Sequence, residues 1–286
     1  MAVTRALWAT APTFLIAGQS NMAGRCLEVD LLGEFTFSGK PSPSFGGVEF
    51  EMCWDNDSNF GAGGGNSNGQ WLPLQCQQSP GLGGLRYFGP EFGIASTLGP
   101  RLFDMGFRKA RFLKFALGST NIHSNWNPDN GRQTGKPGEV GHYTRFRDFA
   151  LRHSGDHGVV GLFWLQGESD SSKAKDANAY LDNFDRFATA LRRDLSCPEI
   201  VVSPVVWNGK RVDTINQALK ETEDRVKHCV CIDTLDQSFG IQSVDAWPGR
   251  AGHLDAEAVC DVGKRMGRAM PLDNLRSTLT GMNPCL

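Results

Sequence analysis

The sequence predicts an α/β domain built on a parallel sheet of five strands. Five short apolar runs, each bounded by glycine or proline, are typical of strands buried on both faces. Segments with the three- and four-residue apolar spacing of amphipathic helices lie between and after these runs. Strands that alternate with such helices favour right-handed crossovers, which produce a parallel sheet covered by helices on both faces.

The expected elements follow one another without a linker or an internal repeat. The five strands are expected at 13–17, 111–117, 159–165, 200–206 and 229–232. The clearest helix is expected at 176–195, and another at 258–269 has Asp255 as its N-cap and Pro271 beyond its end. Weaker helical patterns cover 212–226, 143–152 and 92–103, the last interrupted at Gly99-Pro100. We therefore expect one domain over 12–271, followed by a C-terminal tail at 272–286.

The segment 28–90 is predicted to be an elaborated loop insertion. It holds 13 of the 34 glycines, five prolines, seven acidic residues and only two basic ones. The eight cysteines are scattered without CxxC pairs, so buried free thiols are expected, although Cys53 and Cys76 could pair in an oxidising compartment.

Composition excludes several classes of protein. With 29 basic and 31 acidic residues and no dense Lys/Arg run, the chain lacks the electrostatic footprint of a nucleic-acid or membrane-surface protein. No run approaches the roughly 20 apolar residues of a membrane helix. The run LWATAPTFLIAG resembles a secretory signal, but cleavage there would remove the strand before GQSNM. By default we expect a cytoplasmic protein without nucleic-acid or membrane partners.

Residues able to do chemistry cluster where the expected strands end. The first strand leads into Ser20, which could present its hydroxyl as a nucleophile or simply cap the next helix. The second ends beside Gly118, whose N–H could approach a substrate closely. The third leads into Gln166 and Glu168, an amide and a carboxylate that could stabilise an oxyanion and orient a base, or form a polar loop. His253, just before the last helix, is the best candidate base.

The segments GQSNMAG, ALGSTNIHSNW, WLQGESD and a late Gly-His before the final helix together resemble the SGNH hydrolases. Within them the chain is similar to the sialate O-acetylesterase-like group, which includes carbohydrate esterase family six acetylxylan esterases. The resemblance covers nearly the whole chain, including the Gly89-Pro90 turn. It implies a single-domain, flavodoxin-like three-layer sandwich with a five-stranded parallel sheet.

The resemblance also implies a mechanism without a metal or organic cofactor. Ser20 would be the nucleophile and His253 the general base. The backbone N–H groups of Ser20 and Gly118, with the side chain of Gln166, would form the oxyanion hole. The expected substrate is an acetylated saccharide such as acetylated xylan or an acetylated sialic acid.

Two positions depart from the family pattern. Arg250 stands three residues before the histidine, where relatives have an acid, so we expect Glu168 to be the third member of the triad. Asp245, Asp255 or a bare Ser-His dyad are the alternatives. Ser119 stands where relatives have a second glycine, and its side chain would narrow the crevice.

Residues that bind substrate are expected next to the nucleophile and in the insertion. Gln19 and Asn21 flank Ser20. Trp54 and Trp71, together with Phe60, could stack on sugar rings above Ser20 or form a small satellite core instead. Two other functions stay open at this point: an esterase for other short acyl or lipid esters, and a saccharide-binding relative without turnover.

Overall fold

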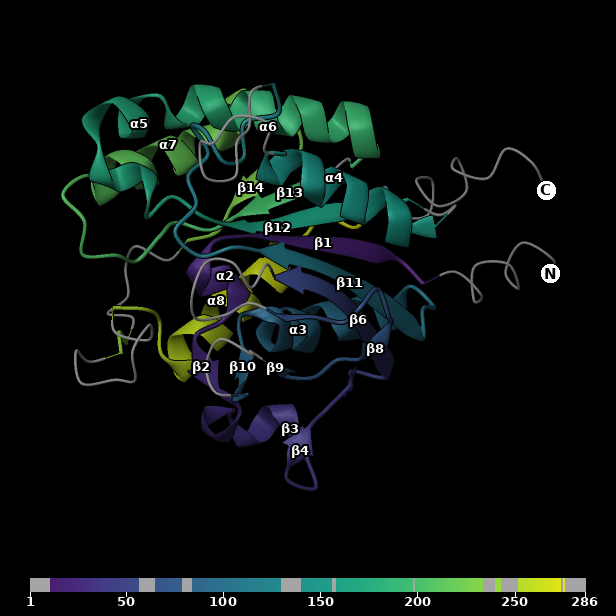
Figure 1. Ribbon diagram of the computed structural model, residues 1–286. Helices are drawn as coiled ribbons and strands as arrows, with labels where there is room; N and C mark the ends of the chain where they lie inside the picture. Colours follow the sequence, from purple (N-terminus) through teal and green to yellow (C-terminus); the bar gives the residue numbers. More distant parts are fainter. Residues whose placement is uncertain are drawn as a thin grey trace, which may run out of the picture.

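The computed structural model is an α/β fold with a central, mostly parallel sheet and helices on both faces (Figure 1). It describes residues 11–56, 65–78, 84–129, 140–155, 158–197, 199–233, 240–242, 252–273 and 275. The core lies between the sheet and its two helical layers, where every residue of β1 (Thr13–Gly18) is buried.

The sheet places the first strand in the middle. Parallel strands lie in the order β14–β13–β12–β1–β11–β6, with the antiparallel β5 at the edge. Their bounds are β14 (Cys229–Cys231), β13 (Glu199–Val202), β12 (Gly161–Leu165), β11 (Lys109–Ala116), β6 (Val48–Asn56) and β5 (Ser44–Phe45). In register, Ile16 of β1 lies opposite Lys114 of β11 and Phe163 of β12.

Helices cover the two faces of the sheet in separate groups (Figure 1). One group comprises α4 (His142–His153), α5 (Ala174–Asn178), α6 (Tyr180–Leu195) and α7 (Val212–Arg225). The other comprises α3 (Glu91–Asp104) and α8 (Ala256–Ala269), which pack against each other. Each helix turns an apolar stripe inward, as the spacing of its sequence predicts. None of the helices in the described part of the chain is long and apolar enough to cross a membrane.

Small strands in the insertion and just before it form two further sheets. One consists of β2 (Cys26–Leu27), β10 (Arg86–Phe88) and β9 (Gln77–Gln78). The other pairs β3 (Thr36–Phe37) with β4 (Lys40–Pro41), while β7 (Gly65–Asn66) and β8 (Leu72–Pro73) pair with β6.

The five predicted strands and the parallel sheet are confirmed, but the sheet has a sixth parallel strand. That strand, β6, lies inside the segment predicted to be loop. It was not predicted because acidic residues alternate with the apolar residues that pack on the core, so the run is not continuously apolar. The helix expected at 176–195 breaks at Ala179 into α5 and α6. Conversely, α3 continues through Pro100 without interruption. Cys53 and Cys76 are buried free thiols.

Candidate active site

Ser20 lies in a tight turn between β1 and the short helix α2 (Ser20–Ala23). Gly18 makes this turn possible, since a Cβ atom there would lie 2.0 Å from the carbonyl oxygen of Leu165 on β12. The next residue, Gln19, donates its backbone N–H to that same oxygen at 3.0 Å. The turn therefore holds Ser20 at the carboxyl edge of the sheet, where open α/β folds bind their ligands.

His253 pairs directly with Ser20. Its Nε2 lies 2.9 Å from Ser20 Oγ, although the residues are far apart in the sequence. The loop that carries it is held on both sides: Gln242 N–H donates to the His253 carbonyl, and Leu254 N–H donates to Asn21 Oδ1. With Nε2 unprotonated, the imidazole can accept the serine proton, which is the geometry of an activated nucleophile.

Gly118 approaches the nucleophile, as expected from the end of the second predicted strand. A Cβ atom built on it would lie 3.6 Å from Ser20 Cβ and 2.8 Å from Arg25 Nη2. Sequence reasoning did not single out Arg25, although it directly follows GQSNMAG. Its guanidinium is buried, and desolvation lowers its pKa to about 10. At neutral pH Arg25 thus places a positive charge beside the Gly118 turn.

The side chain of Glu168 is hydrogen-bonded to that of Asn21. Glu168 Oε1 accepts Asn21 Nδ2–H at 2.8 Å, and the same asparagine receives the N–H of Leu254, the residue after His253. Glu168 Oε2 has no hydrogen-bond partner among the described residues. Burial raises the pKa of this carboxyl to about 7. Asn21 therefore connects Glu168 to the backbone of the histidine loop.

The alternative acids have different outcomes. Asp255 is the N-cap of α8: its Oδ1 accepts the N–H of Ala258 at 2.9 Å, so its carboxylate serves the helix. Asp245 and Arg250 lie outside the described residues.

Contrary to the prediction, the side chain of Gln166 does not face the crevice. Its side chain is fully buried, and Nε2 donates to the Thr120 carbonyl at 2.9 Å and to Asp170 Oδ2 at 2.6 Å. Asp170 in turn accepts the N–H of Ile122. The side chain of Gln19 is buried too, and its Oε1 accepts the N–H of Ser169. These groups tie together the loops after β1, β11 and β12, and the amide of Gln166 is used below the site rather than for an oxyanion.

The aromatic residues predicted above Ser20 lie elsewhere. Trp71 packs on Arg111, whose guanidinium carbon lies 4.9 Å from the centre of the Trp71 ring. Arg111 is near the start of β11, at the end of that strand opposite Gly118. Trp54 is 6% exposed and lines a separate pocket. Phe60 lies outside the described residues. The aromatic residue beside the pair is Trp207, which is 36% exposed with its ring centre 5.8 Å from that of His253.

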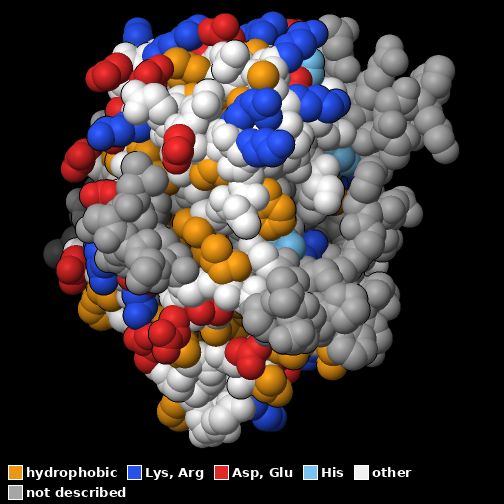
Figure 2. All heavy atoms as spheres, turned by 90° about the vertical axis from the view of Figure 1, so that its left-hand side faces the viewer, with side chains coloured by type: hydrophobic (Ala, Val, Ile, Leu, Met, Phe, Trp, Pro, Cys, Tyr) orange, Lys and Arg blue, Asp and Glu red, His pale blue; other side chains and the backbone are white. Residues whose placement is uncertain are grey.

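The surface around this edge of the sheet is mostly uncharged. Figure 2 shows hydrophobic side chains and a histidine in the middle of the face, with basic groups gathered above and acidic groups below. The described residues contain no group of three or more His, Cys, Asp or Glu side chains that could hold a metal ion. A serine hydroxyl paired with an imidazole is an arrangement that can support acyl transfer through attack by the serine.

Comparisons with known proteins identify the family of the chain. The family model of the carbohydrate esterases described as sialic acid-specific acetylesterases matches residues 10–271. A probable carbohydrate esterase of Arabidopsis thaliana, At4g34215, is 27% identical over 113 residues, which span 39% of this chain and 40% of that relative.

Two solved structures share the fold. The structure of the Arabidopsis protein has a TM-score of 0.65 at 21% identity, covering 90% of this chain and 96% of that one. NanS has a TM-score of 0.58 at 14% identity, covering 91% and 96%. Because the family model spans almost all of the described residues, the chain belongs to the sialic acid-specific acetylesterase family of carbohydrate esterases.

Proposed function

We propose that this protein is a serine esterase that removes O-acetyl groups from carbohydrates. The observation that carries the proposal is the 2.9 Å contact between Ser20 Oγ and His253 Nε2 in the turn after β1. Membership of a carbohydrate acetylesterase family supports the substrate class. The order of β14, β13, β12, β1 and β11 in the sheet supports the flavodoxin-like arrangement that the resemblance to SGNH hydrolases implies.

Catalysis begins when Ser20 Oγ attacks the carbonyl carbon of the acetyl ester while His253 Nε2 accepts the serine proton. The carbonyl oxygen becomes an oxyanion facing the backbone N–H groups of Ser20 and Gly118. The positive charge of Arg25 beside Gly118 favours the negative charge that develops there. The sugar oxygen leaves with the proton from His253, and an acetyl ester remains on Ser20.

Hydrolysis of the acetyl ester on Ser20 by water completes the cycle. His253 Nε2 takes a proton from a water molecule, whose oxygen attacks the acetyl carbon. The second tetrahedral intermediate collapses to acetic acid as His253 returns the proton to Ser20 Oγ, and the acid then ionises in solution. In this scheme Glu168 is a positioning residue that holds the histidine loop through Asn21, and Trp207 forms one wall for the incoming sugar.

Kinetics of the Ser20→Ala and His253→Ala variants test the proposal. Removing a nucleophile or its base costs up to about six orders of magnitude in kcat. We expect that loss of kcat with p-nitrophenyl acetate and with acetylated xylan. Mass spectra of quenched wild-type enzyme should show one acetyl group on Ser20. Rates that rise from acetyl to octanoyl esters would contradict a deacetylase, and an active Ser20→Ala variant would contradict the serine mechanism.

A further inference from the structure

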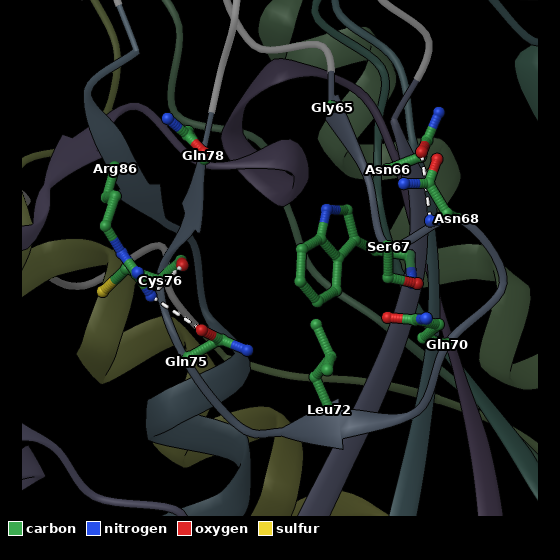
Figure 3. Close-up of a pocket in the computed structure, with 11 residues that line it drawn as sticks. Gly65, Asn66, Ser67, Asn68, Gln70, Leu72, Gln75, Cys76, Gln78 and Arg86 are labelled. Atoms are coloured by element: carbon green, nitrogen blue, oxygen red, sulfur yellow. Dashed lines mark hydrogen bonds between the residues drawn. The ribbon is translucent and has the colours of Figure 1, made fainter.

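A second cavity lies in the insertion, apart from Ser20 and His253. Its volume is about 490 Å³, within the range of small-molecule sites, and neither catalytic side chain lines it. Residues 65–68 and Gln70 form one wall, and the β9 and β10 region forms the other (Figure 3). Trp54, at the end of β6, and Leu72 of β8 provide its apolar surface.

Carboxamide side chains dominate the polar lining. Asn68 and Gln70 lie on one wall in Figure 3, and Gln75 lies on the opposite wall. The side chains of Asn68 and Gln70 make no hydrogen bond within the described part of the chain. Each amide offers both donors and an acceptor, which is what a ligand covered with hydroxyl groups requires.

The described residues that line the cavity carry no unbalanced charge. Arg86, the one charged residue among them, donates to Gln75 Oε1 at 2.9 Å, and its Nε lies 3.2 Å from the carboxylate of Glu28. The guanidinium is therefore already paired, so an anionic ligand gains little from it. Uncharged amides beside an apolar indole favour a neutral polyhydroxylated ligand, whose hydroxyl groups and C–H faces match these two kinds of surface.

The position of the cavity relates it to the candidate active site. Trp54 lies opposite Lys114 of β11, which lies opposite Ile16 of β1, so Trp54 is two strand spacings, about 10 Å, from the strand that carries the nucleophile turn. Arg86 on the other wall belongs to β10, whose Phe88 pairs with Cys26, shortly after Ser20 in the chain. The cavity and Ser20 therefore lie on neighbouring parts of the molecule.

We propose that this amide-lined pocket binds a neutral sugar unit of an oligosaccharide whose acetyl group is presented to Ser20. The inference rests on the proposed esterase function and narrows it to acetylated neutral oligosaccharides that extend beyond the reacting sugar. The small ester p-nitrophenyl acetate cannot occupy both places, so its hydrolysis is independent of the pocket.

The test combines Asn68→Gly with Gln70→Ala in one variant. Asn68 has φ +52°, which glycine adopts freely, and Gln70 is exposed, so both changes remove amides without disturbing the fold. Gln217→Ala, which removes an exposed amide on α7, is the matched control. Titration calorimetry would measure the binding of three unacetylated neutral sugars, xylohexaose, cellohexaose and mannohexaose, and of anionic sialyllactose. Steady-state kinetics would be measured with acetylated xylohexaose and with p-nitrophenyl acetate.

We expect at least one neutral hexasaccharide to bind, and the double variant to weaken that binding about tenfold, as the loss of one or two net hydrogen bonds implies. The KM for acetylated xylohexaose should rise similarly, while kcat/KM for p-nitrophenyl acetate and the control variant stay unchanged. No binding by any neutral hexasaccharide, equal binding by the double variant, or preference for sialyllactose would overturn the pocket proposal. A wild type that binds a hexasaccharide but hydrolyses neither ester would instead overturn the esterase function.

Discussion

The Glu168→Gln substitution separates two roles for the buried carboxyl group. Glutamine keeps an oxygen that can accept Asn21 Nδ2–H, so the 2.8 Å contact survives as a neutral hydrogen bond. A hydrogen bond to a charged group contributes about 1.5–3 kcal/mol and a neutral one about 0.5–1.5 kcal/mol, so the substitution weakens this contact by about 1 kcal/mol. If Glu168 acts through Asn21, kcat/KM should therefore fall by about fivefold.

The alternative gives a much larger effect. If Glu168 directly stabilised the protonated His253, an amide in its place would reduce kcat by about four orders of magnitude. Initial rates with p-nitrophenyl acetate at pH 8 distinguish the two, because a carboxyl with a pKa of about 7 is mostly ionised there. Glu221→Gln, on the exposed side of α7, is the matched control. A loss of three orders of magnitude or more in Glu168→Gln would refute the positioning role.

The same carboxyl predicts how stability depends on pH. Burial raises the pKa values of Glu168 and Asp170 to about 7, above their values in the unfolded chain. The free energy of unfolding that their protonated forms contribute is therefore fully present at low pH and is lost as pH rises through about 7. Between pH 4.5 and 8 the wild type should lose on the order of 3 kcal/mol more than Glu168→Gln, at about 1.4 kcal/mol per pH unit between the two pKa values. Urea denaturation of both proteins across this range measures the difference, and parallel pH curves would contradict the reasoning.

Three further substitutions test other contacts. Asp255→Ala should lower the free energy of unfolding by about 1 kcal/mol through loss of the α8 cap, with kcat unchanged, and a collapse of kcat would instead identify Asp255 as the catalytic acid. Lys114→Met leaves the buried carboxylate of Glu91, 2.7 Å from the lysine, without its ion-pair partner, and should lower the free energy of unfolding by about 3–5 kcal/mol in urea denaturation. Adding Glu91→Gln should restore part of this loss. Full stability in the single variant would argue against a buried ion pair. Trp207→Ala should raise the KM for acetylated xylohexaose several-fold with kcat unchanged, as expected for one aromatic contact of about 1 kcal/mol, and an unchanged KM would remove this residue from the sugar site.

The sequence predicted where the backbone places the candidate site. Ser20, Gly118 and Glu168 follow strands whose apolar runs are unmistakable, and parallel strands bring their carboxyl ends to one edge. The sequence also predicted that His253 would reach this edge from the loop before α8.

The directions of several side chains could not be predicted. Gln166 turns inward to Asp170 and Tyr180, because the strand end sets the face on which its amide lies. Trp71 meets Arg111 only after β8 has paired with β6, a contact no local pattern encodes. β6 was missed for a different reason: it lies in a glycine-rich segment, and acidic residues stand between its apolar ones.

The central position of β1 also has a consequence for the order of folding. This strand pairs with β11 and β12, whose partner residues lie about 100 and about 150 positions later in the chain. The turn that carries Ser20 depends on the carbonyl oxygen of Leu165, so it cannot close until β12 has docked. Contacts of such long sequence separation slow folding. During synthesis on the ribosome, esterase activity should therefore emerge late, well after the nucleophile itself has been translated.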